Sequence, residues 1–131
     1  MDFREDEDVI ETFIEETLGH LEIIQNGIMF LEKQGQNMDD KLIHQIFREA
    51  HTMKAGANLL ELKNIERLAH HMEDILDLIR KKQVVVDNDL VGAFLHGLDT
   101  IRDLLDDIQD SDIADIAVIL QKIKNIIPVS Q

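Results

Sequence analysis

Long stretches without a helix-breaking residue are the feature that most constrains how this chain can fold. Its 131 residues include one proline, Pro128, and six glycines. Because these two residue types disfavour helix interiors most strongly, almost nothing interrupts long helices. Hydrophobic residues make up 44% and charged residues 31% of the chain, a balance that is typical of folded domains and not of disordered segments. The sequence therefore predicts an all-α fold in a single domain over residues 1–131.

Apolar residues recur at intervals of three and four in five segments, which is the pattern of amphipathic helices. The first segment covers about residues 8–33 and ends before Gly35, a residue suited to a helix C-terminus. The next helices are expected at about 40–60, 65–80, 88–109 and 113–127, the last ending at Pro128. Because the connections are short, neighbouring helices should run antiparallel in an up-and-down bundle of about five helices. The candidate N-caps, which carry side-chain oxygens, are Asp39, Asn64, Asp87 and either Ser111 or Asp112.

The formal net charge of −14 limits the partners of the protein. No cluster of Lys and Arg offsets this charge, so the electrostatic attraction that drives nucleic-acid binding is missing. The chain has no cysteine, which excludes disulfides and suits the cytoplasm. No apolar stretch approaches the roughly 20 residues of a membrane span, and the N-terminus is acidic where a signal peptide is basic. We expect a soluble, cytoplasmic protein that neither binds nucleic acid nor inserts into membranes.

The exposed face of the second helix carries the residues best suited to chemistry. On a helical wheel His51 lies about 140° from the middle of the apolar stripe, which is near Ile46, so the imidazole should face water. Lys54 and Ala55 lie three and four positions further on and should be its neighbours. Ala55 and Gly56 are small residues that would let the active site of another protein approach His51 closely. Gly56 is also expected to give clearance for packing.

The third helix has an acidic flank beside its apolar face, formed by Glu66, His70, Glu73 and Asp77. If the second and third helices pack antiparallel, a carboxylate on this flank can reach His51. A carboxylate bonded to one ring nitrogen fixes the tautomer and leaves the other nitrogen as a nucleophile, and Glu73 is our candidate for that role. The ammonium of Lys54 can offset the negative charge of a transferring phosphoryl group. These residues predict a phosphoryl-accepting histidine.

Two stretches resemble a known family. His51-Thr52-Met53-Lys54-Ala55-Gly56-Ala57 is similar to the signature of histidine-phosphotransfer (HPt) domains, H-x-x-K-G-[SG]-A. The run from Leu68 to Leu76 resembles the third helix of the N-terminal phosphotransfer domain of CheA-type chemotaxis histidine kinases. The resemblance covers nearly the whole chain and implies a four-helix HPt bundle plus a C-terminal helix. It also implies that His70 and Glu73 complete the hydrogen-bonded site of His51. Two family glycines are replaced, by Ala55 and Asn58.

The function that this resemblance implies is that of a phosphocarrier in two-component chemotaxis signalling. His51 would receive a phosphoryl group from the ATP-binding domain of a histidine kinase and pass it to an aspartate of CheY- or CheB-like response regulators. The chain would then be an HPt domain, possibly the N-terminal part of a longer kinase. No glycine-rich phosphate loop is evident, so we expect the domain itself to bind no cofactor, while ATP is used by a separate kinase domain.

Two other interpretations remain open. In the first, the chain is a non-catalytic helical adaptor that binds a partner through the exposed face of the second helix. In the second, the neighbouring His70 and His71 belong to a metal-binding bundle. None of the six histidines follows an acidic residue by three positions, the spacing that carboxylate-bridged metal bundles use, so we predict no metal site.

Overall fold

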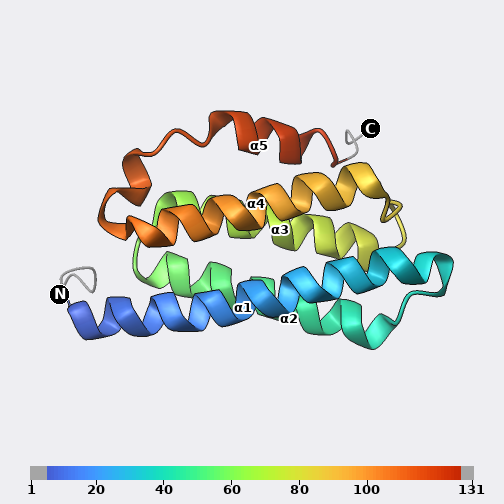
Figure 1. Ribbon diagram of the computed structural model, residues 1–131, viewed down its shortest axis with the longest axis horizontal. Coiled ribbons are helices and arrows are strands. Elements are labelled where there is room, and N and C mark those ends of the chain that lie inside the picture. The colour runs from blue at the N-terminus through green and yellow to red at the C-terminus, as the bar shows by residue number, and fades with distance from the viewer. Residues whose placement is uncertain (1–5, 128–131) are drawn as a thin grey trace.

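The computed structural model describes residues 6–127. Its four long helices are α1 (Glu7–Gln34), α2 (Asp40–Leu59), α3 (Lys63–Arg80) and α4 (Asn88–Asp106). These helices run up and down side by side, and the shorter α5 (Ala117–Lys124) lies along the outer side of α4 (Figure 1). Two 3₁₀ helices, η2 (Gly35–Asn37) and η3 (Ile108–Ile113), lie in the connections. The predicted all-α, up-and-down bundle is confirmed.

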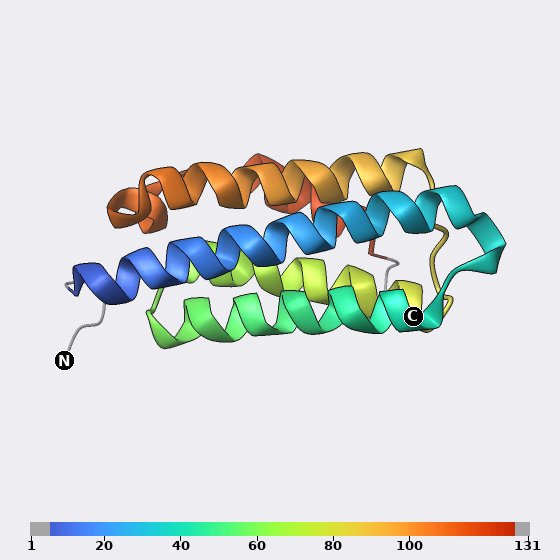
Figure 2. The ribbon, with the colours of Figure 1, turned by 60° about the horizontal axis from the view of Figure 1, so that its bottom comes forward.

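Each long helix packs against two of the others, in the ring order α1, α2, α3, α4, so the core lies between all four (Figure 2). The apolar stripe of α3 faces this core as its spacing predicts. Seven of its residues are fully buried, namely Ile65, Leu68, Ala69, Met72, Ile75, Leu76 and Ile79. The apolar faces of α1 and α2 pack against the same core, where Ile24 and Ile46 are also fully buried.

Two of the predicted N-caps are confirmed. Oδ1 of Asp39 accepts a hydrogen bond from the backbone N–H of Lys41, and Oδ1 of Asp87 accepts one from Leu90. These carboxylates satisfy amide groups that have no partner within the first turn of a helix. The caps place the starts of α2 and α4 where the sequence predicts them.

The other predicted caps are wrong. Asn64 lies inside α3 and is buried, and its Nδ2 donates hydrogen bonds to the carbonyl oxygens of Ser111 (2.7 Å) and Ala114 (3.0 Å). Ser111 is buried within η3, where its Oγ donates to the carbonyl oxygen of Ile108. Asp112 also lies within η3 and does not precede a helix. The α4 helix ends at residue 106 and not near 109. The side chains of Asn64 and Asp112 are used in contacts between α3 and η3, while the hydroxyl of Ser111 bonds within η3 itself.

The C-terminal part also differs in extent from its prediction. The fifth helix is shorter than the predicted 113–127, and it begins at Ala117 with no side-chain cap on its N-cap residue, Ile116. The predicted end at Pro128 lies outside the described residues. Among residues 6–127, no helix is both long and apolar enough to cross a membrane.

The connection between α2 and α3 determines how these helices face each other. The backbone N–H of Leu62 donates to the carbonyl of Ala57, and that of Glu61 donates to Asn58, which is the double hydrogen bond of a Schellman motif. Glu61 has φ of 57°, the left-handed conformation that this motif requires. The chain therefore reverses within three residues, and α3 returns antiparallel beside α2.

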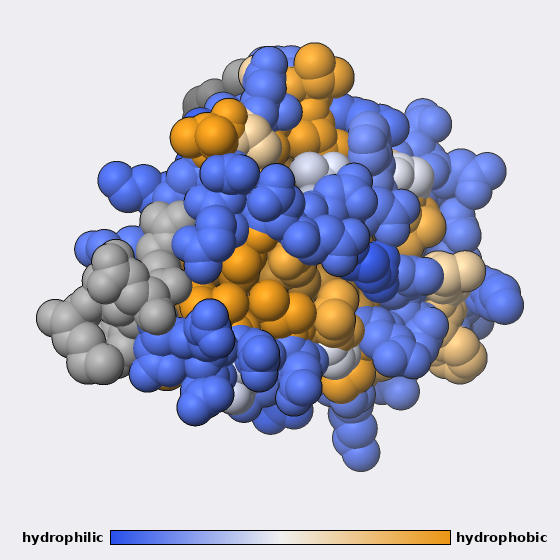
Figure 3. Space-filling model, turned by 60° about the vertical axis from the view of Figure 1, so that its left-hand side comes forward, coloured by the Kyte–Doolittle hydropathy of each residue, from blue (hydrophilic) through white to orange (hydrophobic). Residues whose placement is uncertain are grey.

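Charged and polar side chains cover most of the surface. The end of the molecule where α1 begins and α4 ends is mainly hydrophilic, with an apolar area in its middle (Figure 3). Leu59, at the end of α2, and Ile113, in η3, are 66% and 83% exposed. Exposed apolar side chains are normal in folded domains, so exposure by itself gives neither residue a function.

Candidate functional site

The site is built around His51, in the C-terminal half of α2. Its side chain is 60% exposed, as the helical wheel predicts. Nδ1 of the imidazole lies 2.7 Å from Oε2 of Glu73, which projects from α3. The antiparallel packing of α2 and α3 therefore brings the predicted carboxylate to the predicted histidine.

Glu73 binds two residues of α2 at once. While Oε2 accepts the hydrogen bond of His51, Oε1 lies 2.9 Å from Nζ of Lys54. The carboxylate is 14% exposed and the lysine 24%, so both are partly shielded from water. Because each oxygen has its own partner, the carboxylate is held in one orientation, and so is the imidazole ring.

The charge on Glu73 follows from its surroundings. Burial by itself raises the pKa of this carboxyl, but the hydrogen bonds from Lys54 and His51 outweigh burial and leave the pKa below its ordinary value of 4.5. Glu73 is therefore ionised near neutral pH and can only accept hydrogen bonds. Nδ1 of His51 must then carry the hydrogen, and Nε2 keeps its lone pair in the neutral ring. An exposed imidazole with a free Nε2 is a nucleophile for group transfer.

His70, the fourth predicted site residue, has its described contacts within its own helix. Its Nε2 lies 3.6 Å from Oδ1 of Asp74, one turn further along α3, and its ring stacks on that of His71 at 6.0 Å between centroids. Among residues 6–127 it makes no hydrogen bond to His51 or Glu73. Its role in hydrogen bonding at the site stays a prediction.

The two small residues after Lys54 lie in different environments. Ala55 is exposed, so it leaves room around His51. Gly56 is half-buried, and a Cβ there would lie 3.2 Å from Cε1 of Phe13 in α1. Gly56 therefore permits close packing of α2 on α1, which supports its expected role in packing. That Ala55 and Gly56 give a partner protein access to His51 stays a prediction.

A second histidine pair was missed by reasoning from sequence. His20 of α1 bonds through Nδ1 to Oε2 of Glu49 in α2. The two side chains are 23% and 21% exposed. His20 also lines a hollow of about 280 Å³ that runs beside Thr52 and Ala55. Twenty-nine positions separate the partners, so no local spacing predicts the pair.

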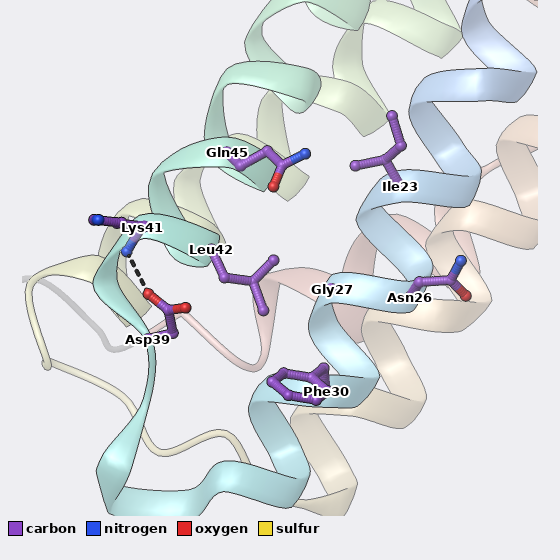
Figure 4. A pocket seen from close by; sticks show the side chains of 8 residues that line it. All are labelled: Ile23, Asn26, Gly27, Phe30, Asp39, Lys41, Leu42 and Gln45. Atoms are coloured by element: carbon purple, nitrogen blue, oxygen red, sulfur yellow. Dashed lines mark hydrogen bonds between the residues drawn. The ribbon is translucent and has the colours of Figure 1, made fainter.

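A larger hollow, of about 560 Å³, lies between α1 and α2 nearer the start of α2. Phe30 and Leu42 face each other across it, and the side chain of Lys41 points outward (Figure 4). None of its lining residues belongs to the site of His51. Among the described residues, no group of three or more His, Asp or Glu is placed to hold a metal ion.

Comparison with known proteins identifies the family. A family model described as "Hpt domain" matches residues 8–111, most of the chain. The chain belongs to the Hpt domain family. This Hpt domain is 37% identical over 101 residues to the chemotaxis protein CheA of Borreliella burgdorferi. The matched part is 77% of the chain but 12% of that relative, so the chain spans a small part of the relative's length.

Solved structures confirm the fold of the Hpt domain. A solution structure of the histidine phosphotransfer domain of CheA matches with a TM-score of 0.79 and 27% identity, covering 96% of both chains. The crystal structure of the phosphorylated P1 domain of CheA3 in complex with CheY6 from R. sphaeroides has the same fold. Its TM-score is 0.74 at 20% identity, over 95% of both chains. The predicted resemblance to HPt domains of the CheA type is confirmed.

Proposed function

We propose that this Hpt domain is a phosphocarrier in which His51 is the acceptor. The observation that carries the proposal is the chain of contacts from Lys54 through Glu73 to Nδ1 of His51, which leaves an exposed Nε2 with a free lone pair. Family membership and the likeness to CheA support it. The adaptor interpretation does not need such an oriented imidazole, and nothing in the geometry favours it.

The chemistry consists of two in-line displacements. In the first, the lone pair of Nε2 of His51 attacks the γ-phosphorus of ATP held by a histidine kinase domain, and the bond from phosphorus to the ADP oxygen breaks. In the second, a carboxylate oxygen of a response-regulator aspartate attacks the same phosphorus, and the electrons of the P–N bond return to Nε2. The proton on Nδ1 stays hydrogen-bonded to Glu73 throughout. Glu73 thereby stabilises the positive charge that the ring gains during attack.

The partners and setting follow from this scheme. The domain takes its phosphoryl group from a kinase domain that binds ATP, holds no cofactor itself, and donates to CheY- or CheB-like regulators in the cytoplasm. A structural neighbour in complex with CheY6 supports a regulator of this kind as partner. Lys54, whose ammonium touches Glu73, supplies positive charge beside the transferring group.

A labelling experiment tests the assignment of His51. The kinase domain of a CheA relative and radiolabelled ATP should give the wild-type domain an acid-labile, base-stable label, which a CheY-like regulator then removes. His51→Gln should take no label while its circular dichroism spectrum is unchanged, because the side chain is exposed. His44→Gln, an exposed histidine on the same helix, is the control and should label normally. Label on His51→Gln would contradict the proposal.

A further inference from the structure

The cations of α2 and of the end of α3 differ in whether they have a partner. The ammonium of Lys54 is bound to Glu73, and Arg80 and the next residue, Lys81, are both paired with Asp77. Arg48 of α2 is exposed, and among residues 6–127 it has neither a hydrogen bond nor an ion pair. Arg48 is therefore a cation whose full hydrogen-bonding capacity is available close to the site.

The position of Arg48 on α2 makes it a neighbour of His51. It lies three residues before His51, as Lys54 lies three residues after it, and residues at this spacing have Cβ atoms about 5–6 Å apart. Side chains of a helix lean toward its N-terminus, so the ring of His51 covers the turn that contains Arg48. The guanidinium, at the end of a long side chain, can reach a group attached to Nε2.

The charge balance of the site calls for such a cation once His51 is phosphorylated. The form of the imidazole that attacks phosphorus is the neutral one, and the charges of Glu73 and Lys54 cancel. A phosphoryl group carries a charge of about −1.5 to −2 at neutral pH, and the single positive charge that the ring gains offsets only part of it, in a domain whose net charge is already −14. Lys54 cannot neutralise it alone, because Glu73 holds its ammonium. A planar guanidinium offers two parallel N–H donors to phosphoryl oxygens.

We propose that Arg48 binds the phosphoryl oxygens on Nε2 of His51 and stabilises their charge during transfer. This inference rests on the proposed function and deepens it. Lys54 and Glu73 then position the ring, while Arg48 contacts the group that moves. The α2 helix thereby supplies both the nucleophile and the cation, with no contribution from the partner's side chains to this contact.

The test compares Arg48→Gln with Lys41→Gln. Lys41 is an exposed cation on the same helix, ten residues and about 15 Å from His51, so both variants lose one charge but only one loses it beside the site. Each domain is phosphorylated with phosphoramidate, and transfer to a CheY-like regulator is timed at several regulator concentrations. Arg48→Gln should lower the maximal transfer rate about tenfold or more at an unchanged KM, and Lys41→Gln should not change the rate. Arg48→Lys should recover part of the loss.

Phosphorus NMR gives a readout that a structural effect would not move. A guanidinium in contact with the phosphoryl group lowers the pKa of its last ionisation, so Arg48→Gln should raise that pKa while Lys41→Gln leaves it at the wild-type value. Equal rates and equal phosphoryl titration in the two variants would overturn the role of Arg48. A change in KM alone would also overturn it, because Arg48 would then contact the regulator. A wild-type domain that accepts no phosphoryl group would overturn the proposed function itself.

Discussion

At the scale of single residues, Glu73 links the two helices that make the site. Among residues 6–127 it is the only side chain hydrogen-bonded to both His51 and Lys54, and it is largely buried where they meet. Because its pKa lies below the ordinary value, it keeps its charge over the whole physiological range. The proposed reactivity of His51 therefore depends on a side chain from another helix.

Replacing Glu73 tests this dependence. Glu73→Ala should slow phosphorylation of His51 by about ten- to a hundredfold, because the ring loses the partner that fixes its tautomer. Helix content should not change, as measured by circular dichroism. Glu66→Ala, which removes another carboxylate from the same flank of α3, is the matched control and should phosphorylate at the wild-type rate. An unchanged rate in Glu73→Ala would remove this carboxylate from the mechanism.

His71 makes the stability of the domain depend on pH. Its Nδ1 is buried, and among the described residues it has no hydrogen-bond partner. Burial lowers the pKa of His71 below 6.5, with Lys124, His70 and Arg67 acting in the same direction and Asp74 against them. The folded state thus favours the neutral ring. The unfolded chain binds a proton more readily, so stability should fall as pH drops below about 6.5.

Denaturation at two pH values checks the sign of this effect. The urea midpoint of the wild type should fall between about pH 7.5 and about pH 5.5, and the fall should be smaller in His71→Gln. His44→Gln, which changes an exposed histidine, should behave as the wild type does. An equal fall in His71→Gln and wild type would show that His71 does not cause the pH dependence.

At the scale of helices, two glycines of α1 differ in what surrounds them. A Cβ on Gly27 would collide with Cγ2 of Ile46 in α2, so this glycine allows the two helices to approach closely. A Cβ on Gly19 would meet nothing within 4 Å. Gly19 has no packing role in the described structure. Its only effect there is to destabilise the helix relative to alanine.

Alanine substitutions at these two glycines should have opposite effects. Gly27→Ala should lower the free energy of unfolding by about 1–3 kcal/mol, because α1 and α2 must move apart or Ile46 must leave its rotamer. Gly19→Ala should raise it by about 0.5–1 kcal/mol, since alanine favours the helix. Urea denaturation of both variants against the wild type measures the two changes. Stabilisation by Gly27→Ala would mean that the close approach is not needed.

At the scale of the whole molecule, Asn64 ties the C-terminal part of the chain to the bundle. It connects the first turn of α3 to carbonyl groups 47 and 50 positions away. These contacts hold η3 and the start of the segment that leads to α5. The segment from 108 to 116 holds only the short 3₁₀ helix η3, so its position depends on such tertiary bonds.

Removing the amide of Asn64 should loosen this attachment. Asn64→Ala should destabilise the domain by about 1–3 kcal/mol, because two carbonyl groups lose their donor, one of those bonds being buried. Hydrogen exchange should show faster exchange in residues 108–124 than in α1 and α2. Uniform loss of protection over all helices would instead show that the C-terminal part unfolds only with the bundle.

Local sequence was sufficient to predict the four long helices and half of the candidate site. The spacing of apolar residues depends only on helix geometry, so α1 to α4, the exposure of His51 and its nearness to Lys54 follow from short-range order. Glu73 was predicted because one further assumption, antiparallel packing across a short turn, brought it to the right face. Asn64 and Asp112 were assigned wrongly for the converse reason, because their side chains bond to groups far away in the chain, while the hydroxyl of Ser111 bonds to Ile108 within η3.

Sequence by itself thus determined which faces of the helices are wet and which are buried, because a 3.6-residue period leaves little freedom. Only the tertiary structure decided which polar groups meet. It gave Glu73 two partners, joined His20 to Glu49, and left Arg48 without a counter-ion from any residue between 6 and 127. Such pairings depend on the register between helices, and a shift of one turn, about 5.4 Å, would change every one of them without altering a single helical pattern.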